Sequence, residues 1–291
     1  MKKSHLALLA LGLLQLPCTV WALKIQTLDL KRHYRFYEGA DKTFVGDPYD
    51  WSGVARTVDV GKWGAMISPS YFVSANHFHP AAGETFRFYH SNNTNGTYEE
   101  RIVLSGQKIL GASDANSDLW LGKLNAPVSG AVAKYPILRL PNSLSDYPGK
   151  TIHVFGRPTD NNQATNSQVR LHMGISKISS VQADSGGSYF SWYTSNAPFG
   201  GDTALYAEGG DSGGSSFIVF NGVPTFLGTH YYPNMSSFAP DYISQFNAAM
   251  SASGEQVTVI DLDTMPALPQ GFSAAFVPGA GVALHWSDIA D

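Results

Sequence analysis

The stretch Glu208–Ser216, "EGGDSGGSS", places Ser212 among four glycines and directly after an aspartate. Gly and Ser are common in surface turns, so on its own the stretch predicts only a turn. A serine hydroxyl becomes a nucleophile when a neutral imidazole accepts its proton and a carboxylate orients that imidazole. The stretch therefore raises the question of whether a histidine and an aspartate elsewhere in the chain stand in suitable positions.

Two upstream segments supply such residues. His77 follows "GKWGAMISPSYFVSAN" at 61–76, where two apolar runs are joined by a Ser-Pro turn. Asp118 lies in "NSDLWLGKL" at 116–124, where a polar loop meets an apolar strand, so its carboxylate can be partly buried and still meet a neighbour. These positions predict that His77 and Asp118 lie at strand ends.

Each residue also has a plainer interpretation. His77 could be a packed strand-end histidine, or half of a metal pair with His79, although no third or fourth ligand is suggested. Asp118 could belong to a calcium loop that begins with "DANSD" at 114–118. That loop would need Gly and Glu where the chain has Leu119 and Asn125. The sequence therefore predicts no metal site and no cofactor.

The remainder of the chain has the pattern of an all-β protein. Short apolar runs alternate with turn residues, 29 Gly and 16 Pro favour turns over long helices, and 43% hydrophobic residues exclude a disordered chain. Asn221-Gly222 between two apolar runs predicts a hairpin. One helix is expected at 240–250, with Asp241 as its cap. Strands are expected at 64–68, 71–75, 85–90, 101–110, 118–124, 151–156 and 169–181, with a hairpin tip at 91–97.

The three segments, taken in this order, resemble the chymotrypsin/trypsin superfamily of serine endopeptidases over Phe36–Asp263. The distances along the chain support the resemblance. His77 and Asp118 are 41 residues apart and Asp118 and Ser212 are 94 apart, which lets the first two lie in one barrel and Ser212 in a second. The resemblance implies two packed antiparallel six-stranded β-barrels with one short C-terminal helix. The expected boundaries are 23–140 for the barrel with His77 and Asp118, 141–263 for the barrel with Ser212, and 264–291 for a tail.

The resemblance also implies the roles of the site residues. Ser212 would attack a scissile carbonyl, His77 would act as general base and then general acid, and Asp118 would accept a hydrogen bond from the imidazole. The backbone N–H groups of Gly210 and Ser212 would form an oxyanion hole. The partner implied is a polypeptide substrate.

The expected substrate pocket contains Tyr206, His230, Tyr231 and Tyr232. Tyr206 stands where trypsins carry an aspartate, which argues against a preference for Arg or Lys. His230 in "LGTHYYP" resembles a residue of glutamyl endopeptidases and could face an acidic side chain or form a pocket wall. Pro233 follows on the expected edge strand and lacks an N–H for substrate pairing.

Asp211 raises the possibility of a zymogen. In the family an aspartate here pairs with a newly cut N-terminus, and its plainer interpretation is a turn-capping residue. The segment His33–Gly39, "HYRFYEG", faintly resembles an activation site after Arg35, although Phe36 departs from the family's small-residue start. Cleavage after Arg35 is therefore a hypothesis.

The N-terminus predicts secretion, to the periplasm or outside the cell. Lys2 and Lys3 precede an apolar run, and Ala22 ends a cleavage motif, so residues 1–22 are expected to be a signal peptide and Leu23 the first mature residue. The only cysteine, Cys18, would leave with the signal. No membrane segment is expected after it. The formal net charge of -4, with no basic stripe, argues against a nucleic-acid partner.

At the other end, 268–288 resembles the opening of a fibronectin type III module, with Trp286 at a core position. Two function classes follow from the whole sequence. The first is a secreted serine endopeptidase, and the second is a non-catalytic binding protein on the same fold, its pocket closed by tyrosines. Reactivity of Ser212 separates the two classes. The sequence does not indicate an oligomeric state.

Overall fold

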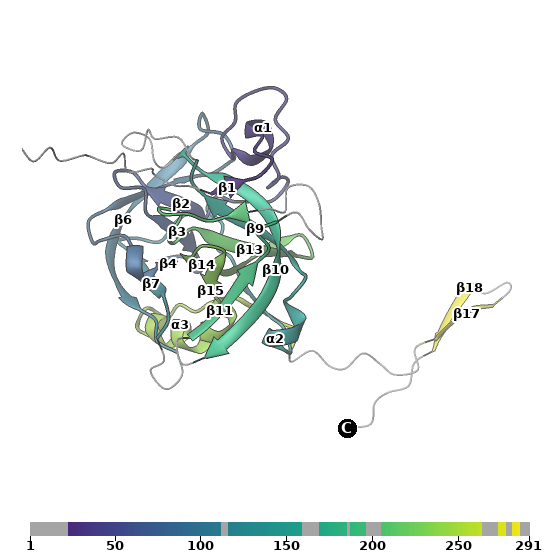
Figure 1. Cartoon of the computed structure of the whole chain (residues 1–291). Coiled ribbons are helices and arrows are strands. Elements are labelled where there is room, and N and C mark those ends of the chain that lie inside the picture. Colours follow the sequence, from purple (N-terminus) through teal and green to yellow (C-terminus); the bar gives the residue numbers. More distant parts are fainter. Residues whose placement is uncertain are drawn as a thin grey trace, which may run out of the picture.

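Two closed barrels form the body of the protein (Figure 1). The computed structural model describes residues 23–111, 116–158, 169–184, 187–195, 205–263, 273–277 and 281–285. The expected signal peptide, Asp114 and Trp286 lie outside these residues. Each barrel has six antiparallel strands, which confirms the expected fold class.

The first barrel, in blue in Figure 1, follows the order β2-β3-β4-β7-β6-β5. Apolar side chains alternate into its interior, where Phe72 and Phe86 meet edge to face at 4.7 Å and Trp120 packs against Phe72. The strands are β2 (Val54–Thr57), β3 (Trp63–Met66), β4 (Tyr71–Ala75), β5 (Thr85–Tyr89), β6 (Tyr98–Lys108) and β7 (Leu119–Leu124).

The second barrel follows the order β10-β11-β15-β14-β13-β9. The predicted turn at Asn221-Gly222 joins β13 to β14, and both residues have positive φ angles of 48° and 80°, as the tight hairpin requires. The strands are β9 (Thr151–Gly156), β10 (His172–Asp184), β11 (Gly187–Trp192), β13 (Ser215–Phe220), β14 (Val223–Tyr232) and β15 (Met235–Ser237).

Aromatic side chains fill the interface between the barrels. The ring of Trp51, which precedes β2, lies 5.4 Å from the ring of Phe155 on β9 and 5.2 Å from that of Phe217 on β13. Tyr135 lies 4.7 Å from Phe217. All four residues belong to one buried cluster. This shared core fixes the relative position of the barrel ends that carry the candidate site.

Short elements complete the chain. Strand β8 (Ile137–Arg139) lies between the barrels in sequence and pairs in parallel with β16 (Val259–Asp261). The Arg139 guanidinium binds the Asp261 carboxylate through Nε at 3.1 Å and Nη2 at 2.6 Å. The others are β1 (Lys24–Ile25), α1 (Leu30–His33), α2 (Ser143–Asp146), β12 (Leu205–Tyr206), α3 (Ile243–Met250), β17 (Ser273–Val277) and β18 (Gly281–His285).

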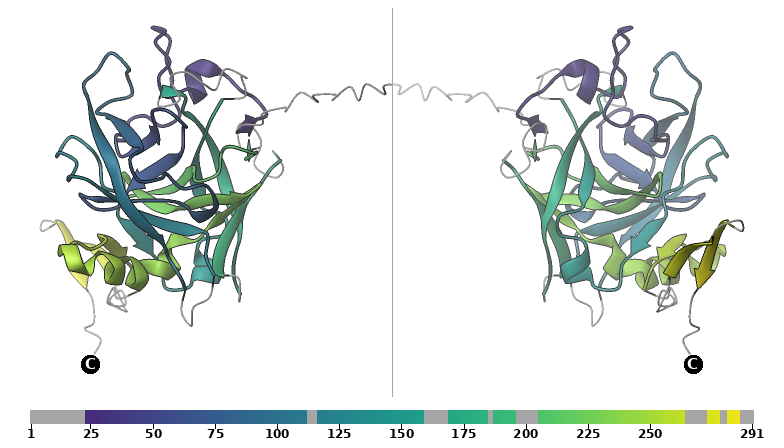
Figure 2. Two further views of the ribbon diagram at one scale, coloured as in Figure 1. Left: turned by 90° about the vertical axis from the view of Figure 1, so that its left-hand side faces the viewer. Right: turned by 90° about the vertical axis from the view of Figure 1, so that its right-hand side faces the viewer.

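The predicted helix is α3, at one end of the barrels in both views of Figure 2. Phe246 and Met250 are fully buried, as their spacing predicts. The expected cap is wrong, because Asp241 lies in the preceding 3-10 turn Ala239–Tyr242 and accepts a hydrogen bond from Ser143 instead. The pair β17–β18 supplies the two strands expected in the tail.

The structure differs from two of the sequence-based expectations for the N-terminal segment. β1 was expected with the first barrel, but it pairs with β12, which precedes the Ser212 loop. Arg35 is 1% exposed and donates to Val54 O and Asn92 Oδ1, each at 3.0 Å, while Phe36 lies in the core. A protease binds its scissile segment in an extended, exposed form, so the structure contradicts an activation site after Arg35.

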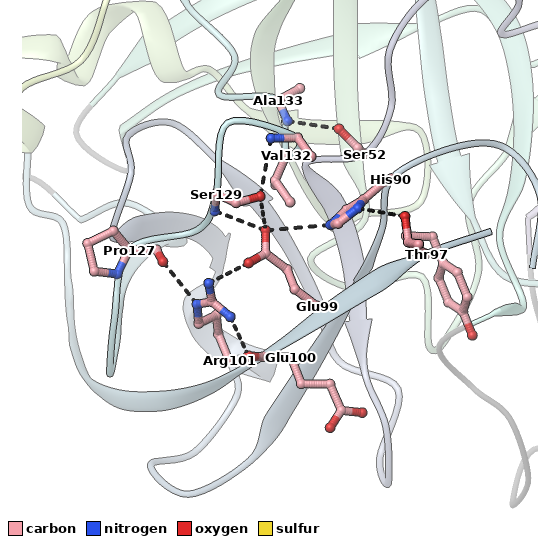
Figure 3. Close-up of polar contacts among 12 residues, drawn as sticks. Ser52, His90, Thr97, Glu99, Glu100, Arg101, Pro127, Ser129, Val132 and Ala133 are labelled. Atoms are coloured by element: carbon pink, nitrogen blue, oxygen red, sulfur yellow. Dashed lines mark hydrogen bonds and ion pairs between the residues drawn. The ribbon is translucent and has the colours of Figure 1, made fainter.

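A polar network fastens β6 to the segment 127–133 (Figure 3). Glu99 Oε1 accepts from Ser129 N at 2.9 Å and from Ser129 Oγ at 2.8 Å, and Oε2 pairs with Arg101. Burial alone would raise the pKa of Glu99, but the Ser129 hydrogen bonds and the charges of Arg101 and His90 outweigh it and lower the pKa. The neighbouring Glu100 makes a more exposed pair with Arg87.

Replacing Glu99 by glutamine is expected to lower the free energy of unfolding by about 1–3 kcal/mol at neutral pH, because it removes a partly buried charged acceptor. The native pKa of Glu99 is depressed, so its contribution is present above the unfolded pKa and is lost as pH falls through the folded pKa. Urea unfolding at neutral and acidic pH measures both effects. Glu100→Gln is the control, expected within about 0.5 kcal/mol of wild type. Equal losses in the two variants would contradict the role of the network.

Candidate active site

The two barrels bring His77, Asp118 and Ser212 together. His77 lies in a 3-10 turn, Asn76–Phe78, that follows β4, and Asp118 directly precedes β7. β4 and β7 pair with Ala75 opposite Leu119, so the two side chains leave the sheet at one edge. Ser212 comes from the second barrel, in the loop before β13.

The three side chains form a hydrogen-bonded chain. His77 Nδ1 lies 2.6 Å from Asp118 Oδ2, and His77 Nε2 lies 2.7 Å from Ser212 Oγ. Asp118 Oδ1 accepts a further bond of 2.9 Å from the backbone N–H of His77. The pattern is satisfied when Nδ1–H donates to Asp118 and Nε2 accepts from the serine hydroxyl.

Burial differs along this chain of residues. The Asp118 side chain is 9% exposed, whereas that of His77 is 41% exposed. The largely covered Asp118 carboxylate contacts His77 through both oxygens and so holds the imidazole in one orientation. The more exposed imidazole edge and Ser212 remain open to a substrate. The arrangement is able to move the Ser212 proton onto His77 as the oxygen attacks an electrophile.

The glycines shape the loop around Ser212. Gly210 and Gly213 have φ angles of +94° and +83°, which side-chain-bearing residues rarely adopt. A Cβ at Gly210 would also overlap the guanidinium of Arg157. Arg157 Nη2 donates to Gly209 O at 2.6 Å, so this arginine supports the loop from behind.

The backbone N–H groups of Gly210 and Ser212 have no hydrogen-bond partner among the residues that the structure describes. The neighbouring donors of the loop are used: Gly213 N donates to His230 O at 3.1 Å, and Gly214 N donates to Asp211 O at 2.7 Å. Two unpaired donors beside a nucleophile provide what an oxyanion hole needs.

A cavity of about 90 Å³ lies beside Ser212. Its lining includes three of the expected pocket residues, His230, Tyr231 and Tyr232, together with Ala207 and Pro233. The fourth, Tyr206, lines a neighbouring cavity of about 390 Å³ with Lys24 and Glu208.

His230 is a buried wall of this cavity. Its Nε2 lies 2.7 Å from Phe155 O and its Nδ1 lies 3.0 Å from Ser236 Oγ. Burial lowers the pKa of His230 to about 4, although the bond to Phe155 opposes that shift. A neutral imidazole with both nitrogens engaged provides no charge for an acidic substrate side chain, so the geometry favours the wall over the acidic-side-chain interpretation.

The alternative interpretations of His77 and Asp118 find no support in these contacts. His79 turns away from His77: its Nδ1 contacts Pro80 O at 3.0 Å and its ring stacks on Trp120 at 4.5 Å. Asp118 directs both carboxylate oxygens at His77. The metal pair and the calcium loop therefore do not match the arrangement.

The sequence reasoning missed two residues that bear on the site. Arg157 lies directly after β9 and reaches the Ser212 loop, and Leu23 donates its backbone N–H to Arg157 O at 3.2 Å. Neither contact has a local sequence signal, because both contacts join distant segments of the chain.

Two β-barrels that bring a serine, a histidine and an aspartate together between them are the defining features of the trypsin-like class of serine peptidase folds. The family model described as Trypsin matches residues 53–234, which is more than half of the chain. The chain therefore belongs to the trypsin family.

Among solved structures, the chain is similar to the crystal structure of the scabies mite inactivated protease paralogue S-D1. The two share 13% sequence identity, the match covers 70% of this chain and 93% of that one, and the TM-score is 0.47. No curated protein matches the chain.

Proposed function

We propose that this protein is a secreted serine endopeptidase that hydrolyses peptide bonds through an acyl-enzyme intermediate. The observation that carries the proposal is the contact of 2.7 Å between Ser212 Oγ and His77 Nε2, with His77 held by Asp118. Membership of the trypsin family supports the same reaction class. Within the described residues, no helix has the length and apolar character needed to cross a bilayer.

The first half-reaction acylates the enzyme. Ser212 Oγ attacks the scissile carbonyl carbon while its proton passes to His77 Nε2. The carbonyl oxygen becomes an oxyanion and accepts from the N–H groups of Gly210 and Ser212, each donor contributing about 3 kcal/mol. The imidazolium, stabilised by Asp118, then protonates the leaving amine, and the C–N bond breaks.

The second half-reaction returns the serine. A water molecule gives a proton to His77 Nε2 and attacks the acyl carbon, and the protonated imidazole returns that proton to Ser212 Oγ as the ester bond breaks. The two half-reactions together consume one water molecule and return Ser212 and His77 to their starting protonation states, so the steps balance without a cofactor or metal. The cavity lined by Ala207 and His230 favours a small, uncharged side chain before the scissile bond.

Treatment with a fluorophosphonate probe tests the proposal. Ser212 Oγ is expected to attack phosphorus and displace fluoride, which leaves one covalent adduct that intact-mass spectrometry detects and peptide mapping assigns. Ser212→Ala and His77→Ala are expected to abolish the adduct. Ser244→Ala, an exposed serine on α3, is the matched control and should label like wild type.

Urea unfolding of each variant shows whether a variant that does not label is folded and lacks only the nucleophile, or has failed to fold. A folded wild-type protein that forms no adduct, or forms it at another residue, would contradict the endopeptidase proposal. The absence of any adduct would leave the non-catalytic binding protein as the function class.

A further inference from the structure

The peptide unit between Gly209 and Gly210 carries one of the two candidate oxyanion donors. It contains the carbonyl oxygen of Gly209 and the N–H of Gly210, and this N–H has no hydrogen-bond partner among the residues that the structure describes. The unit is trans, since Asp47–Pro48 is the only cis peptide bond in the described part of the chain. In a planar trans peptide the C=O and N–H bonds point in opposite directions. A contact that fixes the Gly209 carbonyl therefore fixes the direction of the Gly210 N–H.

Arg157 makes that contact. Its Nη2 donates to Gly209 O at 2.6 Å, which is the only hydrogen bond to this peptide unit within the described ranges. The guanidinium also lies directly against Gly210, because a Cβ there would come 2.2 Å from Arg157 Cζ. Hydrogen bonds from a charged donor are stronger than those between neutral groups. The Gly210 N–H is thus directed away from the guanidinium.

The direction away from the guanidinium leads to the nucleophile. Gly209 and Ser212 both line the cavity of about 90 Å³, whereas Arg157 is not among the described residues that line it. The guanidinium therefore lies behind the loop. An N–H that points away from it points toward the cavity and Ser212.

Packing and the other hydrogen bonds of the loop do not hold this peptide. Glycines flank it on both sides, so rotation meets no Cβ, and both signs of φ are open to Gly210. Gly209 is exposed, and a Cβ built on it would meet nothing within 4 Å. Asp211 N donates to Glu208 O and Glu208 N donates to Asp211 Oδ2, each at 3.0 Å. These two bonds hold the ends of the loop and do not include the central peptide.

A rotated peptide would disable the oxyanion hole. It would turn the Gly209 oxygen toward the cavity, where the carbonyl of a substrate develops negative charge, and it would turn the Gly210 N–H away. A repulsive oxygen would then replace an attractive donor. The population of the unrotated peptide thus sets the share of molecules that are able to stabilise the oxyanion.

We propose that Arg157 is a positioning residue for hydrolysis, because its guanidinium holds the Gly209 carbonyl behind the loop and thereby keeps the Gly210 N–H in the oxyanion hole. Arg157 acts through the peptide that it holds, so it is not itself a catalytic residue. This inference deepens the proposed function and rests on it, since the hole serves the attack by Ser212.

Three variants test the proposal. Arg157→Met keeps a flexible, unbranched side chain and removes its donors, whereas Arg157→Lys keeps the charge and an ammonium group that is able to donate to the same oxygen. Arg32→Met, at an exposed arginine in α1, is the control.

Two substrates report on the hole. For each protein, kcat and KM are measured for an N-acetyl-alanine methyl ester and for its thiono analogue, in which sulfur replaces the carbonyl oxygen. Sulfur is a weak hydrogen-bond acceptor, so hydrolysis of the thiono ester depends less on the donors of the hole. The ratio of the two kcat values therefore measures the contribution of the hole.

Arg157→Met is expected to lower kcat for the oxygen ester by about 10- to 100-fold, the population ratio that one charge-assisted hydrogen bond maintains. KM should stay within about twofold of wild type, since Arg157 does not line the cavity. The loss for the thiono ester should be smaller, so the ratio of the kcat values should fall. Arg157→Lys should recover part of the ratio, and Arg32→Met should match wild type.

Crystal structures of the wild-type protein and of Arg157→Met provide a readout that does not need activity. The Gly209 carbonyl is expected behind the loop in the wild-type protein and turned toward the cavity in Arg157→Met. If Arg157→Met does not fold, Arg157→Lys takes its place in both measurements, with a smaller fall in the ratio expected.

The two readouts separate the failure of this inference from the failure of the proposed function. An unrotated peptide in Arg157→Met, an unchanged kcat, or an equal loss of kcat for both esters would overturn the role of Arg157 and leave the endopeptidase proposal standing. A rotated peptide in Arg157→Met, together with a wild-type protein that hydrolyses neither ester, would support the hold of Arg157 on the peptide and contradict the proposed function. An unrotated peptide without wild-type hydrolysis would contradict both.

Discussion

Replacing Asp118 by asparagine is expected to lower kcat by about 10⁴-fold, the magnitude found for this change in other serine proteases with the same triad. In the present structure, Oδ1 accepts from the His77 backbone N–H and Oδ2 faces His77 Nδ1. An asparagine that keeps the first bond turns its NH₂ group toward Nδ1. The imidazole must then carry its proton on Nε2, where it donates to Ser212 Oγ and is unable to accept the serine proton.

The measurement is the steady-state hydrolysis of an N-acyl-alanine ester, whose small side chain suits the cavity beside Ser212. KM should change little, since Asp118 does not line that cavity. Asp146→Asn, in α2, is the control and should retain wild-type kcat. A loss smaller than about tenfold in Asp118→Asn would mean that Asp118 does not set the tautomer of His77.

Replacing Gly228 by alanine is expected to lower the free energy of unfolding by about 3 kcal/mol, near the upper end for overpacking of a well-packed site. Gly228 lies in β14, and a Cβ there would overlap the backbone oxygen of Ser237 at the end of β15. Backbone atoms are unable to rotate away, so the two strands must separate. His230 follows two residues later and shares a hydrogen bond with Ser236 of β15, so the wall of the cavity would move as well.

Urea unfolding measures this loss, and Gly130→Ala provides the matched control. Nothing lies within 4 Å of a Cβ at Gly130, and it has no positive φ angle, so its replacement should change stability by less than about 0.5 kcal/mol. If Gly228→Ala were as stable as Gly130→Ala, the close packing of β14 on β15 would be contradicted.

Much of the fold follows from short-range patterns in the sequence. Asn221-Gly222 has the two positive φ angles that its hairpin needs, and the run at 71–75 forms β4 with the predicted limits, because both depend on neighbouring residues. The placement of His77 and Asp118 at strand ends followed from the same patterns. Their convergence with Ser212 followed only from the family resemblance, because 94 residues separate Asp118 from Ser212.

The predictions that failed depended on contacts between distant segments. Asp241 has the residue type of a cap, but Ser143 engages its side chain, and the helix begins two residues later. The segment His33–Gly39 faintly resembled an activation site after Arg35, although Phe36 departed from the family's small-residue start. The burial of Arg35 depends on Val54 and Asn92, which local sequence does not reveal.

If the protein is the endopeptidase proposed above, the parallel pairing of β8 with β16 bears on its resistance to self-digestion. Ile137–Arg139 connects the barrels, and in an extended polypeptide it would be a natural target for self-digestion. In the structure its backbone is hydrogen-bonded to Val259–Asp261, and the Arg139 guanidinium donates to the Asp261 carboxylate. Self-digestion at this connection first requires the final strand of the body to detach. The chain has one cysteine and therefore no internal disulfide, so this non-covalent pairing is what would oppose cleavage of the connection by the proposed activity.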